Sequence, residues 1–169
     1  MERECFDFAP VVEKDIAVLV DIFNYYVLNT TVTLKKETLG VKEMQDQLFF
    51  KSPLYRSYTI RDGGGVVGYC SIKPWNDPEA CRQTAGVSVY LDKDHRGRGI
   101  GSIALQFLEE RAREEQICNL ICGMTSENYP GHSVARKNGY VRCAHFSKVG
   151  LKFSRTLDMQ FYQKIFTLA

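Results

Sequence analysis

Apolar residues recur along the chain at two spacings, and these spacings predict both strands and helices. Where every second residue is apolar, or a short run is densely apolar, we expect a strand. Where apolar residues recur every three or four positions, we expect a helix. The predicted strands span residues 6–12, 55–60, 66–72, 84–91, 117–124, 140–150 and 156–166, and the predicted helices span residues 15–27, 38–49, 100–116 and 133–138.

Turn-forming residues separate these segments. Residues 62–65 read Asp-Gly-Gly-Gly and predict a tight hairpin between the second and third strands. Asp15 and Thr38 can cap the starts of the first two helices, and Gly139 suits the position after the last helix. Pro10 favours a sheet edge for the first strand. The order of the elements predicts an α+β fold of three layers, in which a mixed, mostly antiparallel sheet carries helices on both faces.

Composition places the chain among ordinary globular proteins. It has 169 residues, with 44% hydrophobic and 25% charged residues, and no repeat or linker divides it, so we expect one domain over residues 1–169. A net charge of +2 argues against nucleic acid as a partner. No apolar run approaches the roughly 20 residues that span a membrane, and no secretory signal is visible. Six cysteines without a Cys-x-x-Cys pair indicate a reduced, cytoplasmic protein, and three scattered histidines argue against a metal site.

A glycine-rich stretch joins the fourth predicted strand to the third predicted helix. Residues 96–101 read Arg-Gly-Arg-Gly-Ile-Gly. Glycines let the backbone approach a ligand closely, arginines suit phosphate, and the start of a helix attracts anions. The pattern indicates a phosphate-binding loop, with a plain glycine turn and solvated arginines as the alternative. A nucleotide-triphosphate loop is disfavoured, because no Lys-Ser/Thr follows the glycines.

These six residues fit the Gln/Arg-x-x-Gly-x-Gly/Ala signature of the GNAT acetyltransferases. Further stretches agree in order over nearly the full length, and together they resemble the phosphinothricin and L-amino-acid N-acetyltransferases. The matching stretches are Asn24-Tyr25-Tyr26, Val66-Val67-Gly68-Tyr69, Pro74-Trp75, Val87-Ser88-Val89-Tyr90, Asn128 with Pro130, Gly139-Tyr140, Val149-Gly150-Leu151-Lys152-Phe153-Ser154-Arg155 and Asp158.

The resemblance implies an enzyme that uses acetyl-CoA as co-substrate. It would move the acetyl group to the amine of a small molecule, an amino acid or an analogue, by direct attack on the thioester in a ternary complex. The fold implied has a central pair of strands that splay apart to admit the thioester. The cofactor-binding residues implied are Val89, Tyr90, Leu91, Arg96, Gly97, Arg98, Gly99, Ile100, Gly101, Ser102, Asn128 and Ser133.

The chain departs from this branch where the chemistry would lie. A glutamate expected on the central strand is Gly86, and a tyrosine expected on the last helix is Ala135. Candidate acid–base groups are His132, which we expect at the surface or in a cap, Glu79 in the polar loop, and Tyr90 on the strand, with Asp77 and Tyr69 as further alternatives. The alternative function is a protein that binds acyl-CoA with little or no turnover.

Two further expectations concern the acceptor and the assembly. Without a placed base, a weakly basic amine is favoured, because an amine of pKa ~10.4 costs about 4–5 kcal/mol to deprotonate at pH 7. The resemblance also implies a homodimer with the C-terminal strands near the interface. The aromatic residues of the tail would supply the apolar patch, unless they complete the core; they are Phe161, Tyr162 and Phe166.

Overall fold

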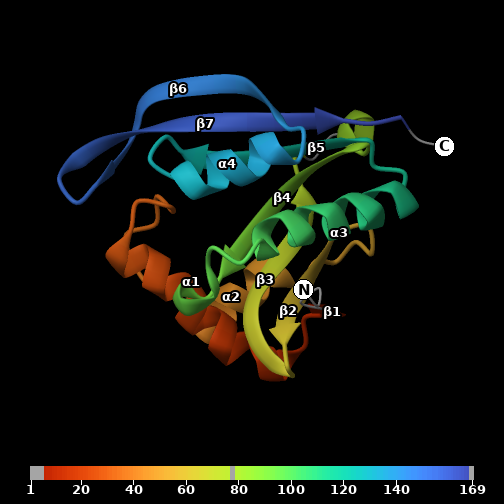
Figure 1. The fold of residues 1–169 in the computed structure, drawn as a ribbon, viewed down its shortest axis with the longest axis horizontal. Coiled ribbons are helices and arrows are strands. Elements are labelled where there is room, and N and C mark those ends of the chain that lie inside the picture. Colours follow the sequence, from red (N-terminus) through yellow and green to blue (C-terminus); the bar gives the residue numbers. More distant parts are fainter. Residues whose placement is uncertain (1–5, 77–78, 168–169) are drawn as a thin grey trace.

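The computed structural model describes residues 6–76 and 79–167. Strands and helices follow one another along the chain in the order that the sequence predicts (Figure 1). The elements are β1 (Asp7–Pro10), α1 (Ile16–Asn29), α2 (Val41–Leu48), β2 (Arg56–Asp62), β3 (Gly65–Pro74), β4 (Thr84–Leu91), α3 (Ile100–Glu114), β5 (Asn119–Thr125), α4 (Tyr129–Lys137), β6 (Val141–Lys152) and β7 (Arg155–Ile165). Short 3-10 helices cover Glu13–Asp15, Glu79–Cys81 and Lys93–His95.

The strands form one sheet in the order β1-β2-β3-β4-β5-β7-β6. Neighbouring strands run antiparallel except for β4 and β5, which pair in parallel. Pro10 therefore lies on an edge strand, as predicted, where its missing N–H costs no ladder bond. The long β6–β7 hairpin forms the other side of the sheet (blue in Figure 1).

Two hydrophobic cores lie on the two faces of the sheet. One packs α3 and α4 against the sheet, and its fully buried members include Ile60, Leu108 and Leu120. The other packs α1 and α2 against the opposite face, around Ile16 and Met44. Buried apolar area of this kind is the main favourable term in folding. The predicted α+β architecture of three layers is confirmed.

Three local details differ from the sequence expectation. Gly40, not Thr38, is the N-cap of α2. The N–H of Gly40 donates to the Glu43 carboxylate over 2.8 Å. Helix α4 begins at Tyr129 rather than at residue 133, because Asn128 caps it and Pro130 suits its first turn. Strand β3 runs on to Pro74, in register with Ala85 of β4.

Candidate active site

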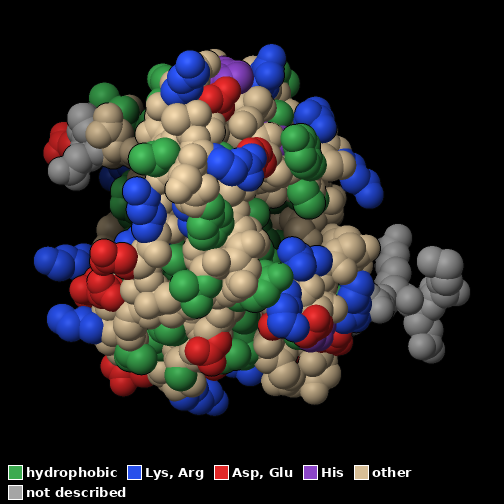
Figure 2. Space-filling model, turned by 90° about the vertical axis from the view of Figure 1, so that its left-hand side faces the viewer, with side chains coloured by type: hydrophobic (Ala, Val, Ile, Leu, Met, Phe, Trp, Pro, Cys, Tyr) green, Lys and Arg blue, Asp and Glu red, His purple; other side chains and the backbone are tan. Residues whose placement is uncertain are grey.

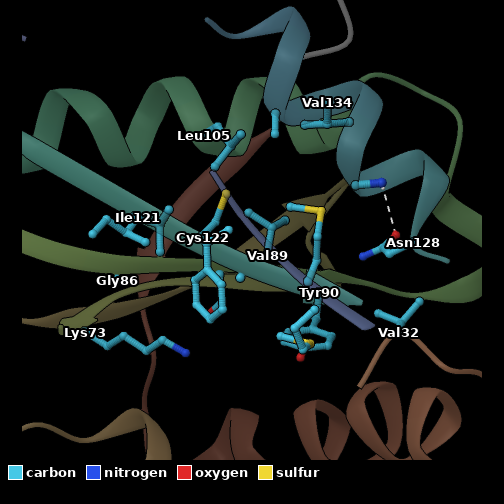
Figure 3. Close-up of a pocket in the computed structure, with 18 of the residues that line it drawn as sticks. Val32, Lys73, Gly86, Val89, Tyr90, Leu105, Ile121, Cys122, Asn128 and Val134 are labelled. Atoms are coloured by element: carbon cyan, nitrogen blue, oxygen red, sulfur yellow. Dashed lines mark hydrogen bonds between the residues drawn. The ribbon is translucent and has the colours of Figure 1, made fainter. Parts of the chain in front are cut away.

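A cavity opens where β4 and β5 separate. The two strands pair only from Thr84–Gly86 to Asn119–Ile121 and diverge beyond that point. The cavity has a volume of about 330 Å³. Its walls come from the strands β3, β4, β5 and β7, the helices α3 and α4, and the loop after α1 (Figure 3). Its lining includes Val32, Lys73, Trp75, Gly86, Val87, Ser88, Val89, Tyr90, Leu105, Cys122, Met124, Asn128, Val134, Met159 and Phe161.

The strand divergence leaves one edge of β4 open. From Val87 to Leu91 this strand pairs with β3 on one side, while its other side faces the cavity instead of β5. Main-chain N–H and C=O groups along that edge need hydrogen-bond partners. A bound extended chain, such as the pantetheine arm of a CoA ester, fits this edge as a strand-like partner.

The glycine-rich loop presents main-chain donors at the start of α3. Gly97 and Gly99 adopt φ of 80° and 79°, the left-handed region that glycine enters without a Cβ penalty, and Gly99 is the N-cap of α3. Within the described residues, the N–H groups of Gly97, Gly99, Ile100 and Gly101 donate no hydrogen bond. Unpaired N–H groups at a helix start form an anion site. The loop therefore fits a pyrophosphate.

The two loop arginines differ in their surroundings. Arg98 forms an ion pair of 2.8 Å with Asp62 and lies over the ring of Phe6, 5.3 Å from its centroid. Arg96 is exposed, donates its Nε–H to the Lys93 carbonyl over 3.0 Å and lies 5.8 Å from the Tyr25 ring centroid. A carboxylate beside Arg98 already offsets its charge, so Arg96 is the more available cation for a phosphate.

Asn128 is the predicted contact from the α4 side that does reach the cavity. Its side-chain oxygen accepts a hydrogen bond of 3.1 Å from the Gly131 N–H (dashed in Figure 3), which leaves its amide nitrogen able to donate. A Cβ on Gly131 would lie 2.7 Å from that amide, so the close turn requires glycine. Ser133 and Ser102 do not line the cavity: Ser133 is exposed, and the Ser102 hydroxyl accepts from Asn138 over 3.0 Å.

Tyr90 lines the cavity and belongs to an aromatic cluster on the α1 side of the sheet. Its ring stacks on Tyr69 at 5.4 Å between centroids and meets Phe23 and Tyr26 edge-on. Burial raises the pKa of Tyr90 to about 12, against a smaller opposing effect of a hydrogen bond with Thr33. Tyr90 thus stays protonated near neutral pH, where it can donate a proton but cannot accept one.

His132 and Glu79 lie outside the cavity. His132 is 4% exposed, which corrects the expectation of a surface or capping residue. Its Nε2 lies 3.0 Å from the Thr125 carbonyl and 3.3 Å from that of Ser126, so it ties the end of β5 to α4. Burial lowers its pKa. Glu79 lines a separate groove near Arg82, and Asp77 lies outside the described residues.

Lys73 enters the cavity where the branch glutamate is missing. It pairs in register with Gly86, and a Cβ built on Gly86 would lie 3.1 Å and 3.2 Å from the Lys73 Cγ and Cε. The lysine stem therefore fills the space beside Gly86. Desolvation lowers the pKa of Lys73. Sequence reasoning missed this residue, because the predicted third strand ends at residue 72; only the register of β3 and β4 shows that Lys73 lies beside Gly86.

The C-terminal stretch 149–155 supports the wall that Val32 provides. Lys152 is 2% exposed, and its ammonium donates to the Thr33 carbonyl over 2.9 Å. A Cβ on Gly150 would lie 2.6 Å from Leu34, so glycine permits this approach. Thr31 donates to Glu127 over 2.8 Å, and Glu127 also pairs with Arg155. These contacts hold the loop after α1 against the β6–β7 hairpin.

Outside the cavity, the surface carries mixed charge. Figure 2 shows Lys and Arg interspersed with Asp and Glu on the face that it presents. Within the described part of the chain, no helix is long and apolar enough to cross a membrane, and no three His, Cys, Asp or Glu side chains gather to hold a metal ion.

Known proteins resemble this chain in sequence and in fold. The chain is 30% identical over 154 residues to the L-amino acid N-acyltransferase MnaT of Escherichia coli, covering 89% of this chain and 88% of that protein. It is 32% identical over 153 residues to an L-methionine sulfoximine/L-methionine sulfone acetyltransferase of Pseudomonas aeruginosa, covering 88% of each. The structure of yncA from Salmonella typhimurium, solved with its cofactor acetyl-CoA, has a TM-score of 0.84 at 26% identity, covering 97% of this chain and 95% of that one.

The profile of the acetyltransferase (GNAT) family matches residues 20–140, which include both strands of the splayed pair and the glycine-rich loop. That match covers more than half of the chain, and the separated central strands and the loop at the start of α3 are the features that the sequence resemblance implied. This chain belongs to the GNAT acetyltransferase family.

Proposed function

We propose that this protein is an acetyl-CoA-dependent N-acetyltransferase that acetylates the amine of a small molecule, an amino acid or an analogue. The observation that carries the proposal is the cavity between β4 and β5. The loop that follows β4 in the sequence adds unpaired main-chain N–H donors at the start of α3. The named activities of the relatives in Escherichia coli and Pseudomonas aeruginosa support an amino-acid-like acceptor. The same names favour an enzyme over a protein that binds acyl-CoA without turnover.

The cofactor half of the site would bind acetyl-CoA through the main chain. Donors at Gly97, Gly99, Ile100 and Gly101 would take the pyrophosphate, with Arg96 adding charge. The open edge of β4 near Val89 would pair with the pantetheine arm and polarise the thioester carbonyl. Asn128 would donate to the arm from the α4 side. Leu91, Ser102 and Ser133 would at most support these contacts, since none of the three lines the cavity.

In the reaction, the neutral amine attacks the thioester carbonyl, the carbon–sulfur bond breaks, and CoA leaves as a thiol after taking up the proton that the amine loses. Main-chain donors of β4 stabilise the oxyanion that forms, an effect typically worth several kcal/mol. Tyr90 can relay this proton, giving its own phenolic proton to the leaving sulfur and taking up the one that the amine loses, because its pKa of about 12 keeps it protonated near neutral pH. Holding donor and acceptor together can supply a further ~7–11 kcal/mol.

Glu79 and His132 fit this reaction less well than Tyr90 does. Neither lines the cavity, and both Nε2 contacts of His132 are to main-chain carbonyls. Because the cavity lining within the described residues holds no carboxylate, we propose that the acceptor itself loses its proton before attack. An α-amine near pKa 8 needs only about 1 kcal/mol for this at pH 7.

Thiol release with a panel of amines, measured beside a calorimetric titration with CoA, tests the proposed function. We expect CoA binding and turnover on at least one amino acid. Binding of CoA without turnover on any amine would overturn the proposal in favour of the non-catalytic alternative.

We also propose a cytoplasmic homodimer. The edge strand β6 exposes Phe146, Val149 and Leu151, each about half accessible, and exposed apolar side chains so grouped favour a protein partner. The tail aromatics contribute less than the sequence suggested, since Tyr162 is 2% exposed and completes the core. The free thiols of Cys70, Cys81, Cys118, Cys122 and Cys143 support a reducing compartment.

Sedimentation at tens of micromolar tests the assembly. We expect a species of twice the 19.3 kDa chain mass, and we expect Leu151→Lys to shift it toward the monomer. A wild-type species at the monomer mass would overturn the dimer.

A further inference from the structure

Among the described residues, Lys73 is the charged side chain that lines the cavity; the other lining groups are apolar or uncharged polar. Its amine points into the cavity in Figure 3, on the same side as Tyr90 and Val32. Leu105 and Val134 of the helices α3 and α4 lie on the opposite side. The lysine thus sits across the cavity from the helices whose loop would bind the phosphates.

The position of Lys73 follows from the sheet. Residues 73 and 86 are register partners on β3 and β4, and glycine at 86 leaves room for the lysine stem to lie along β4. A glutamate at position 86, as in the branch that the sequence resembles, would give the cavity a negative group. This chain instead gives it a positive one. Within the described residues no carboxylate forms an ion pair with Lys73.

Lys73 is exposed to solvent at the cavity, and no carboxylate of the described residues pairs with it, so an anion that enters the cavity meets an available cation. Partial desolvation also lowers the pKa of Lys73, so a bound anion would favour its charged form. The phosphates of CoA have their own donors at the start of α3, so the anion at Lys73 belongs to the other substrate. Next to Lys73, Trp75 and Phe161 meet edge-on at 5.9 Å and offer apolar surface.

We propose that Lys73 binds a carboxylate of the acceptor and so selects amines that carry a carboxylate, with the rest of the acceptor packed against Trp75 and Phe161. The proposal rests on the proposed N-acetyltransferase function and names its substrate class. The same cation disfavours acceptors whose only charge is a protonated amine.

A pair of matched acceptors tests the inference: an L-amino acid and its primary amide, which differ in the carboxylate alone. Initial rates are measured at saturating acetyl-CoA and divided by the fraction of neutral amine, so that basicity does not enter. The wild type is expected to favour the acid by roughly 10- to 100-fold in kcat/KM, the range of one charge-assisted hydrogen bond. Lys73→Met keeps an apolar stem and removes the charge. We expect this variant to lose the preference for the acid over the amide, because its KM for the acid rises. Lys73→Arg is expected to keep it.

Two controls separate the possible failures. Acetyl-CoA affinity measured on Lys73→Met shows that the variant is folded, and Lys42→Met removes a surface charge on α2 and is expected to keep the preference. Equal loss of kcat for acid and amide in Lys73→Met would overturn the inference and indicate a base or a structural role. A wild type that acetylates both acceptors equally would overturn the inference alone. CoA binding without turnover on either acceptor would overturn the proposed function and the inference together.

Discussion

The proposed phosphate loop and the Lys73 wall of the cavity are built by different means. At the start of α3 the groups that would meet acetyl-CoA are main-chain donors, fixed by glycine conformations and a helix start. On the Lys73 side the wall consists of side chains from β3, β4, β7 and the loop after α1. Backbone geometry tolerates changes in neighbouring side chains, whereas a side-chain wall changes with each substitution. One fold can therefore keep its cofactor while its acceptor varies.

The largest expected effect lies on the cofactor side. Gly99→Val places a β-branched residue at φ of 79°, a conformation that costs about 1–3 kcal/mol, and turns the donors of the loop away from the phosphates. We expect CoA affinity to fall by roughly 100-fold or more, since more than one charge-assisted hydrogen bond is lost. Isothermal titration checks this.

Gly139→Val is the matched control for Gly99→Val. Gly139 has φ of 82° and lies after α4, away from the cavity, so the variant suffers similar strain without touching the loop. If both variants lose CoA equally, global destabilisation explains the loss and the loop assignment is wrong.

Gly86→Glu places a carboxylate on β4 beside Lys73. The new side chain must displace the Lys73 stem by a few tenths of an ångström, and its carboxylate would pair with the ammonium. We expect the preference for carboxylate acceptors to fall by about 10-fold or more, and strongly basic amines to gain, within the roughly 10²–10⁴-fold range of base catalysis. Steady-state kinetics with both acceptor classes measures it. An identical change in Gly86→Gln would assign the effect to bulk instead of charge.

We expect Arg96 and Arg98 to contribute unequally to CoA binding. Arg96→Ala is expected to weaken CoA binding by about tenfold, the value of a charge-assisted contact. Arg98→Ala should weaken it less, because Arg98 already pairs with Asp62. Titration at two salt concentrations tests the ranking, and a greater loss for Arg98→Ala would reverse our assignment of the phosphate contact.

The sequence predicts the main-chain loop at the start of α3 better than it predicts the side chains that pack around the site. The strand–loop–helix at residues 84–116 was predictable, because glycines and apolar spacing act locally. Helix α4 was predicted four residues short, because its start depends on the Asn128 cap inside a polar stretch. Lys73 could not be predicted, since its place beside Gly86 depends on the register of two strands. His132 was misread as a surface residue, because its burial arises from packing against Tyr162.

The smallest expected effect concerns His132. Burial lowers its pKa, so the unfolded chain binds a proton first as pH falls below about 6.5. Stability is therefore full above pH 6.5 and falls, by at most ~1.4 kcal/mol per pH unit, as pH drops toward the lower pKa of the folded state. Urea unfolding of His132→Gln, which retains an Nε donor for Thr125, is expected to show a shallower decline over this range.

The same variant separates a structural His132 from a catalytic one. We expect its kcat near neutral pH to stay within a few-fold of wild type. A loss of roughly 100-fold or more, with folding intact, would return His132 to the list of catalytic candidates.

In the proposed mechanism the acceptor supplies its own neutral amine, without a carboxylate base, to a thioester held by the main chain of β4 and α3. The pH profile of kcat/KM, taken at saturating acetyl-CoA with two acceptors of different amine pKa, tests this mechanism. We predict that the inflection moves with the pKa of the acceptor. An inflection that stays at one pH for both acceptors would show that a group of the protein takes the proton, and would contradict this mechanism.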